Sequence, residues 1–229
     1  MTNWSSEELA IVMLSLRVAV VGTMVGLPFA ILAALALGRG RFWGRSLLSA
    51  VVHLPLVLPP VVTGYLLLRV FGRRGVVGAF FEDTLGLSFA FEWTGAALAA
   101  TVMGFPLMVR AIRIAIESVD RRVEDAAATL GASPAWTMAL VTVPMALPGI
   151  IAGMVLGFAK ALGEFGATIT FVSNIPGETQ TLALAIYSFI QSPGGDAQAM
   201  RLVWLSLGVS FAALLASEVL ARRLERRGE

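Results

Sequence analysis

The chain has 229 residues, of which 57% are hydrophobic and only 14% are charged. A soluble domain would carry roughly a quarter of its residues as charged side chains, so this chain cannot cover itself with a polar surface and lipid is its expected solvent. The absence of cysteine and the presence of one histidine exclude a disulfide framework, a thiolate metal site and a histidine-cluster metal site, so we expect no metal and no bound cofactor.

Five apolar stretches are long enough to cross a bilayer. The hydrocarbon core is about 30 Å thick and needs roughly 20 mostly apolar residues per helix. We therefore predict an all-α membrane protein with five transmembrane helices at about residues 9–37, 47–71, 94–112, 143–163 and 200–221. The first stretch is too long for a signal-peptide core and has no basic segment before it, so we expect it to be a retained span.

The basic residues predict the orientation of the spans. Eleven of the 17 lysines and arginines lie in three clusters, which are Arg39, Arg41 and Arg45, then Arg110, Arg113, Arg121 and Arg122, then Arg222, Arg223, Arg226 and Arg227. Five spans with the N-terminus outside place all three clusters on the cytoplasmic side, as the positive-inside rule requires. Arg73 and Arg74 then fall in an outside loop as a minority exception. This placement of charge favours a membrane over a nucleic-acid partner.

A further apolar run at residues 179–191 is too short for a sixth span. Its apolar part is about half the length that a bilayer requires. A sixth span would also move one of the basic clusters to the outside. We therefore expect a short re-entrant or external helix before the last span, supported by other parts of the protein.

The second predicted span carries three prolines, Pro55, Pro59 and Pro60. Proline removes a backbone donor and bends a helix, and the freed backbone groups are tolerated in a bilayer only where protein or a water-filled path satisfies them. We predict that this stretch, together with Gly64, forms a pathway wall or hinge. A static kink that fills the core is the alternative. His53 is expected to lie near the inner interface.

The segment between the third and fourth spans predicts an amphipathic helix followed by a sharp turn. Apolar residues recur at helical spacing from Glu117 to Leu130. Gly131 follows at the position where a left-handed helix end favours glycine, and Ser133-Pro134 is typical of an N-cap before a new helix. A short helix of this kind suits docking into a groove on a partner, whereas an ordinary solvated loop is the alternative.

The fourth predicted span ends with a pair of opposite charges. Lys160 and Glu164 are four residues apart and share a helix face near the predicted outer end of the span. Charges within a span are functional candidates, while a pair at this spacing can neutralise itself. We therefore name Lys160, Glu164 and Gly166 as a candidate outer gate, with a purely structural pair as the alternative.

The loop after the third span resembles the E-A-A-x3-G-x9-I-x-L-P pattern of ABC importer permeases. The sequence reads Asp125-Ala126-Ala127, three residues, Gly131, nine residues, then Val141-Thr142-Val143-Pro144. Aspartate stands where the family usually has glutamate, although Glu124 precedes it, and two valines replace isoleucine and leucine. In that family the loop is the coupling helix that enters a cleft on the ATPase subunit. The resemblance therefore implies an ATPase-coupling role for Glu124, Asp125, Ala126, Ala127, Gly131 and Pro144.

Two other stretches are similar to the molybdate permeases of the binding-protein-dependent importers, the transmembrane type-1 family. They are HLPLVLPPVVTGY at residues 53–65 and FAKALGEFGATITFVSNIPGET at residues 158–179, and the likeness covers about residues 9–218. Sulfate permeases share the Leu-Gly-Glu and Asn-Ile-Pro features and are the close alternative. The double proline followed by Gly-Tyr favours molybdate, which the sequence does not separate from tungstate.

The resemblance implies a type I ABC importer permease fold, with the permease domain at residues 9–217 and a basic cytoplasmic tail at 218–229. It implies two ABC ATPase subunits, an external oxyanion-binding protein and a bacterial inner membrane. Five spans do not easily enclose a path, so we expect a homodimer. No G-x4-G-K-[ST] run occurs, so ATP is expected on a separate subunit and no catalytic residues are expected here.

Two functions of other classes compete with transport. One is a membrane-embedded hydrolase that uses His53 and Glu164, which we expect to lie at opposite ends of their spans. The other is a membrane scaffold that docks partners without moving a substrate. The scaffold accounts for the helix in the loop but not for the prolines of the second span.

Overall fold

The computed structural model describes residues 5–228, with side chains through Leu215, and it is nearly all helical over that range. Three helices are long and apolar enough to cross a membrane, namely α1 (Ser6–Arg39), α5 (Trp93–Ser118) and α12 (Asp196–Gly228), the last over Asp196–Leu215. Two further spans result if each bent helix pair counts as one, namely α2 (Arg45–Val57) with α3 (Pro60–Phe71), and Pro134–Met145 with α9 (Leu147–Leu162). The predicted all-α membrane architecture is confirmed over the described residues, and the five predicted spans are obtained when each bent pair counts as one.

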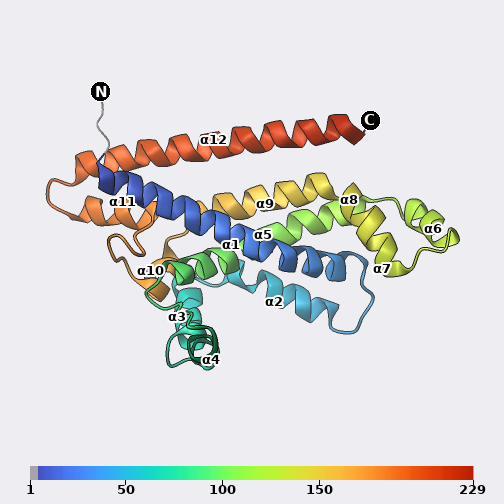
Figure 1. Cartoon of the computed structure of the whole chain (residues 1–229), viewed down its shortest axis with the longest axis horizontal. Helices are drawn as coiled ribbons and strands as arrows, with labels where there is room; N and C mark the ends of the chain where they lie inside the picture. The colour runs from blue at the N-terminus through green and yellow to red at the C-terminus, as the bar shows by residue number, and fades with distance from the viewer. Residues whose placement is uncertain (1–4, 229) are drawn as a thin grey trace.

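Helices α1, α5, α9 and α12 run along the long axis of the molecule (Figure 1). Helix α5 packs against both α1 and α9. Its alanines Ala96, Ala99 and Ala100 are fully buried beside Ala19 of α1. Small side chains let helix backbones approach closely, which is how helices without a hydrophobic drive to associate gain packing energy in lipid.

The two ends of the long axis are built differently. Helices α6 (Arg121–Thr129) and α7 (Pro134–Thr137) lie at one end, while α10 (Gly166–Val172) and α11 (Leu182–Gln191) lie at the other (Figure 1). The C-terminal ends of α1, α5 and α12 lie at the same end of the molecule as α6, and so does the start of α2 (Figure 1). These segments carry the three basic clusters. The predicted orientation requires this arrangement. The side chains of the predicted tail at 218–229 lie outside the described residues, although α12 continues through residue 217 without a break.

The second predicted span is not one continuous helix. α2 ends at Val57, α3 begins at Pro60, and the two helices are bent by 114°. Pro59 and Pro60 lack the N–H groups that would continue the hydrogen-bond ladder, and the Leu58 N–H makes the last bond of α2 to the Leu54 carbonyl, at 3.1 Å. The predicted bend of this span is therefore confirmed, and the break lies at Pro59-Pro60. Pro55 lies inside α2 without interrupting it.

The fourth predicted span is also interrupted. A π-helical turn, η1 (Met138–Thr142), leads into the three-residue helix α8 (Val143–Met145), and the chain then bends by 69° into α9. Helix α9 has 16 residues and is therefore roughly 24 Å long, less than the predicted 143–163 span. The cause is local, since Pro144 and Pro148 stand on the two sides of the bend.

The loop predicted between the second and third spans contains an unexpected helix, α4 (Val76–Leu85). It ends at Gly86, which has φ +64°. Phe81 stacks edge-on against Phe89 at a centroid distance of 5.4 Å, and Phe89 stacks similarly against Phe71 at 5.7 Å. This aromatic chain attaches α4 to the end of α3.

The short helix predicted before the last span is α11, and it is held by its neighbours. The Leu182 N–H donates to the Ser15 hydroxyl of α1 at 2.7 Å, and that hydroxyl donates to the Ile11 carbonyl at 2.8 Å. Nearby, the Glu8 carboxylate of α1 pairs with Arg201 of α12 at 2.8 Å. Helix α11 is therefore supported by protein contacts, as we expected of a re-entrant or external helix.

The contact between α3 and α10 leaves no room at Gly64. An added Cβ would lie 2.5 Å from the Ala167 carbonyl oxygen and 2.9 Å from the Thr170 Cβ. Gly166 on α10 faces Pro60 of α3 in the same way, since an added Cβ would lie 2.7 Å from the Pro60 Cβ. The two glycines allow these helices to touch along their backbones.

We expect Gly64→Ala to lower the thermal unfolding temperature of the purified protein, because overpacking of this kind costs about 1–3 kcal/mol. Gly163→Ala is the matched control, since the nearest atom to its added Cβ, the Ala159 oxygen, is 3.9 Å away. Thermal unfolding of both variants in detergent measures the difference. Equal unfolding temperatures would contradict the close packing of α3 on α10.

Candidate functional site

The segment from α5 to α6 is two helices, because an aspartate cap interrupts it. Asp120 is the N-cap of α6, and its Oδ1 accepts a hydrogen bond from the Arg122 N–H at 2.9 Å. Val119, just before it, is extended and buried. The prediction of a single amphipathic helix over Glu117–Leu130 is therefore wrong at its first turn, and correct from α6 onward.

The turn after α6 has the predicted geometry. Gly131 has φ +88°, in the left-handed region, and the Ala132 N–H reaches back to the Ala127 carbonyl at 3.1 Å. The Ser133 hydroxyl accepts from the Trp136 N–H at 3.4 Å and caps α7, whose first residue is a proline. The turn reverses the chain sharply and fixes how α6 connects to the segment that leads into α9.

Glu124 is bound from two sides by residues far away in the sequence. The Nε and Nη2 atoms of Arg39 both lie 3.0 Å from the Glu124 Oε1, and the Thr142 hydroxyl donates to the same oxygen at 2.8 Å. Arg39 also donates to the Val119 carbonyl at 2.7 Å. The Arg39 and Glu124 side chains are 7% and 19% exposed. These contacts, which we call the Glu124 lock, join the last residue of α1, the middle of α6 and the end of η1.

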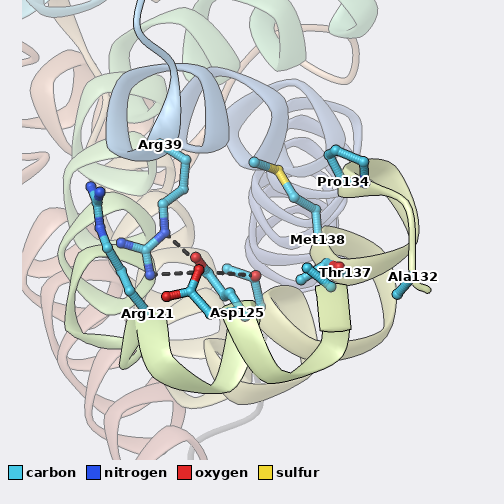
Figure 2. Close-up of a pocket in the computed structure, with 10 residues that line it drawn as sticks. Arg39, Arg121, Asp125, Ala132, Pro134, Thr137 and Met138 are labelled. Carbon is cyan, nitrogen blue, oxygen red and sulfur yellow. Dashed lines mark hydrogen bonds and ion pairs between the residues drawn. The ribbon is translucent and has the colours of Figure 1, made fainter. Parts of the chain in front are cut away.

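A pocket of about 330 Å³ lies beside the Glu124 lock. Figure 2 shows Arg39 reaching down toward α6, with Arg121 and Asp125 on one side of the pocket and Met138 and Pro134 on the other. The Asp125 carboxylate forms no ion pair within the part of the chain that the structure describes. The lining of the pocket therefore combines the paired charges of the lock with the exposed carboxylate of Asp125.

The outer side of α6 and of the following turn faces away from the helical bundle. Ala126 and Ala128 are exposed small residues, and Leu130 and Trp136 are 89% and 62% exposed. Aromatic and aliphatic side chains that gather on an exposed surface are typical of a site that another protein covers. Pro144 lies apart from this surface in sequence, in α8, where it is exposed at the bend before α9.

The structure brings the predicted hinge and the predicted outer gate together. Pro60 of α3 lies against Gly166 of α10. The buried Glu164 carboxylate pairs with Lys160 and accepts a hydrogen bond from the Ala167 N–H at 3.0 Å, so it also caps α10. The self-neutralising pair is thus present, and gating by these residues stays a prediction.

The residues of the competing hydrolase hypothesis do not meet. His53 Nδ1 lies 2.7 Å from the Ser49 carbonyl of its own helix, whereas Glu164 is engaged by Lys160 and by the backbone of α10. Over the described range, no group of three or more His, Asp or Glu side chains is placed to hold a metal ion. The geometry thus gives no support to a hydrolytic site in the membrane.

Comparison with known proteins places the whole chain beside transport proteins. The sequence profile described as "Binding-protein-dependent transport system inner membrane component" matches residues 26–227. The molybdenum transport system permease protein ModB of Escherichia coli is 56% identical over 218 residues, 95% of each chain, and that of Haemophilus influenzae is 53% identical over 220 residues, 96% of each.

A solved structure matches the fold as well. The crystal structure of a bacterial ABC transporter involved in the import of the acidic polysaccharide alginate superposes with a TM-score of 0.76. The match covers 96% of this chain and 80% of that one at 18% sequence identity. At that identity the likeness concerns the fold alone.

Proposed function

The chain belongs to the family of binding-protein-dependent transport system inner membrane components, and from that membership we propose that it is the permease subunit of an ATP-driven importer for molybdate. The resemblance noted in the sequence is confirmed by the two relatives that are 53% and 56% identical. The all-helical type I importer fold is confirmed in the same way. The chain is accordingly a transport subunit and not an enzyme.

Molybdate is proposed because those two relatives are named for molybdenum transport and align along nearly their whole length. Tungstate is nearly the same in size and charge as molybdate, so the proposal covers both anions. Sulfate is the second candidate, since sulfate permeases share the Leu-Gly-Glu and Asn-Ile-Pro features of this sequence.

The proposed assembly is a homodimer with two ATPase subunits that bind ATP and an external oxyanion-binding protein, in a bacterial inner membrane. Helix α12 needs neighbours outside the chain, because only 11% of its most apolar stretch is buried by the rest of the chain. Its exposed Trp204, Leu207 and Phe211 require lipid or a second copy as a neighbour. The α6 end is proposed to face the cytoplasm, where the basic clusters would satisfy the positive-inside rule.

The observation that carries the proposal is the position of α6, which is exposed on its outer side and locked to the bundle on its inner side. A displacement of α6 by a bound ATPase would reach α1 through Arg39 and reach η1 through Thr142. The π-helical turn and the bend at Ala146 then offer a place where the chain can flex before α9. A bare scaffold would need the exposed surface but not this connection.

Uptake by proteoliposomes tests the function and the substrate together. With the full-length chain, the partner ATPase and molybdate- and sulfate-binding proteins, we expect ATP-dependent accumulation of molybdate that clearly exceeds that of sulfate. Vesicles without ATP or without binding protein serve as controls. Accumulation of sulfate but not molybdate would overturn the substrate, and no ATP-dependent uptake of either anion would overturn the importer.

A further inference from the structure

A second pocket, whose charged lining is mainly basic, lies between α2 and α5, apart from α6. It has a volume of about 400 Å³ and is lined by Ser49, His53, Arg110, Arg113, Ile114 and Glu117. It shares Ser49 and Arg113 with a neighbouring hollow that is also lined by Arg45 and Ser46. Neither the Glu124 lock, the outer side of α6, nor the predicted hinge and gate accounts for this cluster of side chains.

The charges in this pocket do not balance. Glu117 is its one carboxylate, and it pairs with Arg113 at 2.8 Å and with Arg45 at 3.7 Å. Arg110 is exposed and forms no ion pair with any residue between 5 and 215. One carboxylate facing three guanidinium groups leaves a net positive site, and it leaves one guanidinium free to bind a ligand.

Helical spacing presents these groups on one face of each helix. Arg110, Arg113 and Glu117 follow at i, i+3 and i+7 on α5, and Ser49 and His53 follow at i and i+4 on α2. His53 Nδ1 lies 2.7 Å from the Ser49 carbonyl, which can only accept, so Nδ1–H is the donor and the ring orientation is fixed. The lining is therefore ordered by contacts within the chain.

The surroundings of the pocket combine apolar and basic character. Leu47, Val51 and Leu54 of α2 are 69%, 58% and 48% exposed, and Ile114 of α5 is 60% exposed. Exposed apolar side chains next to arginines near the ends of membrane helices are typical of the boundary between hydrocarbon and headgroups. Basic pockets between helices at that level suit anionic headgroups.

We propose that this pocket binds a tetrahedral oxyanion, with Arg110 as the principal ligand and with Arg113 and Arg45 in support. The planar guanidinium matches two oxygens of a phosphate-like group, and such charge-assisted bonds are the strong ones. The oxyanion is either the phosphate of an anionic phospholipid or a free inorganic anion. The proposal goes beyond the importer function, because a lipid site would exist whichever anion the protein carries.

The test compares Arg110→Gln with Arg74→Gln, which removes an exposed arginine between α3 and α4 that has no ion pair among the described residues. Retention of phosphatidylglycerol against phosphatidylcholine by the full-length chain is measured by native mass spectrometry. Binding of radioactive sulfate, phosphate and molybdate is measured by equilibrium dialysis. We expect Arg110→Gln to weaken either the binding of phosphatidylglycerol or the binding of the inorganic anions about tenfold, as the loss of one charge-assisted bond implies. Arg74→Gln should change neither binding.

Each outcome decides a point. A loss confined to phosphatidylglycerol identifies a lipid site, and a loss confined to the inorganic anions identifies a free-anion site. Arg110→Lys should keep part of the binding and Arg110→Glu should abolish it, with thermal unfolding confirming that both variants are folded. The proposal is overturned if the wild-type chain binds neither source, or if Arg110→Gln behaves like Arg74→Gln in both measurements.

Discussion

Glu124→Gln is expected to reduce the anion transported per ATP hydrolysed by about tenfold or more, while the chain still inserts into the membrane. Glutamine keeps an oxygen for the Thr142 hydroxyl but removes the counter-charge of Arg39, whose side chain is only 7% exposed. Removing one partner of a buried ion pair costs roughly 3–5 kcal/mol, and the 19% exposure of Glu124 places this pair toward the lower end of that range. The released α6 would then no longer transmit its movement to α1.

The measurement combines ATP-driven uptake with the rate of ATP hydrolysis in the same proteoliposomes. Asp125→Asn is the matched control for stability, because it removes the same charge one residue later from a carboxylate with no ion pair in the described structure. The double variant Arg39→Met/Glu124→Leu should lose less free energy of unfolding than Arg39→Met and Glu124→Leu lose together, since it leaves no buried charge unpaired. A ratio of uptake to ATP hydrolysis in Glu124→Gln equal to that of the wild type would contradict the proposal that the Glu124 lock transmits the movement of α6.

The parts of the fold that were predictable depend on local patterns. A run of about 20 apolar residues identifies a span without any knowledge of what the span packs against. The bounds of α1 and α5 were therefore predicted within a few residues, except at the end of α5. The turn at Gly131 and the cap at Ser133 were likewise predictable, because glycine at a left-handed position and serine before proline act on their own neighbours.

Other features depend on contacts that spacing does not encode. Arg39 and Glu124 are 85 residues apart, and the sequence identified Arg39 only as part of a basic cluster that marks orientation. The prolines predicted a bend in the second span, but the 114° angle also reflects the packing of α3 on α10. Asp120 lies within an amphipathic run, and its role as a cap depends on where α5 ends.

Helix α6 shows the same division between local and long-range features. The resemblance of the loop to importer permeases implied a coupling role for its residues, which stays a prediction, and the structure shows that Asp125 and Ala126 are exposed. It did not indicate that Glu124 faces inward while Asp125 faces outward. Adjacent residues on a helix point about 100° apart, so one serves the internal lock and the other is available to a partner.

Gly131→Val is the second substitution with a large expected effect, and it acts through backbone strain. An added Cβ at Gly131 meets nothing within 4 Å, so there is no clash, but φ is +88°. The left-handed conformation costs an L-residue roughly 1–2 kcal/mol, and a β-branched side chain makes it worse. The turn is then expected to relax, which loses the bond from the Ala132 N–H to the Ala127 carbonyl and changes the angle of α6.

We expect Gly131→Val to hydrolyse ATP with several-fold less uptake, and Gly131→Asn, which tolerates the left-handed region, to remain close to wild type. Gly177→Val is the matched control, because it distinguishes an effect on coupling from a general effect of backbone strain. Gly177 lies between α10 and α11 with φ +79°, and an added Cβ there also meets nothing within 4 Å. It therefore carries a similar strain away from the α6 surface and should leave the ratio of uptake to hydrolysis unchanged. If both valine variants lower that ratio equally, the turn at Gly131 has no special part in coupling, and coupling must depend on another part of the chain.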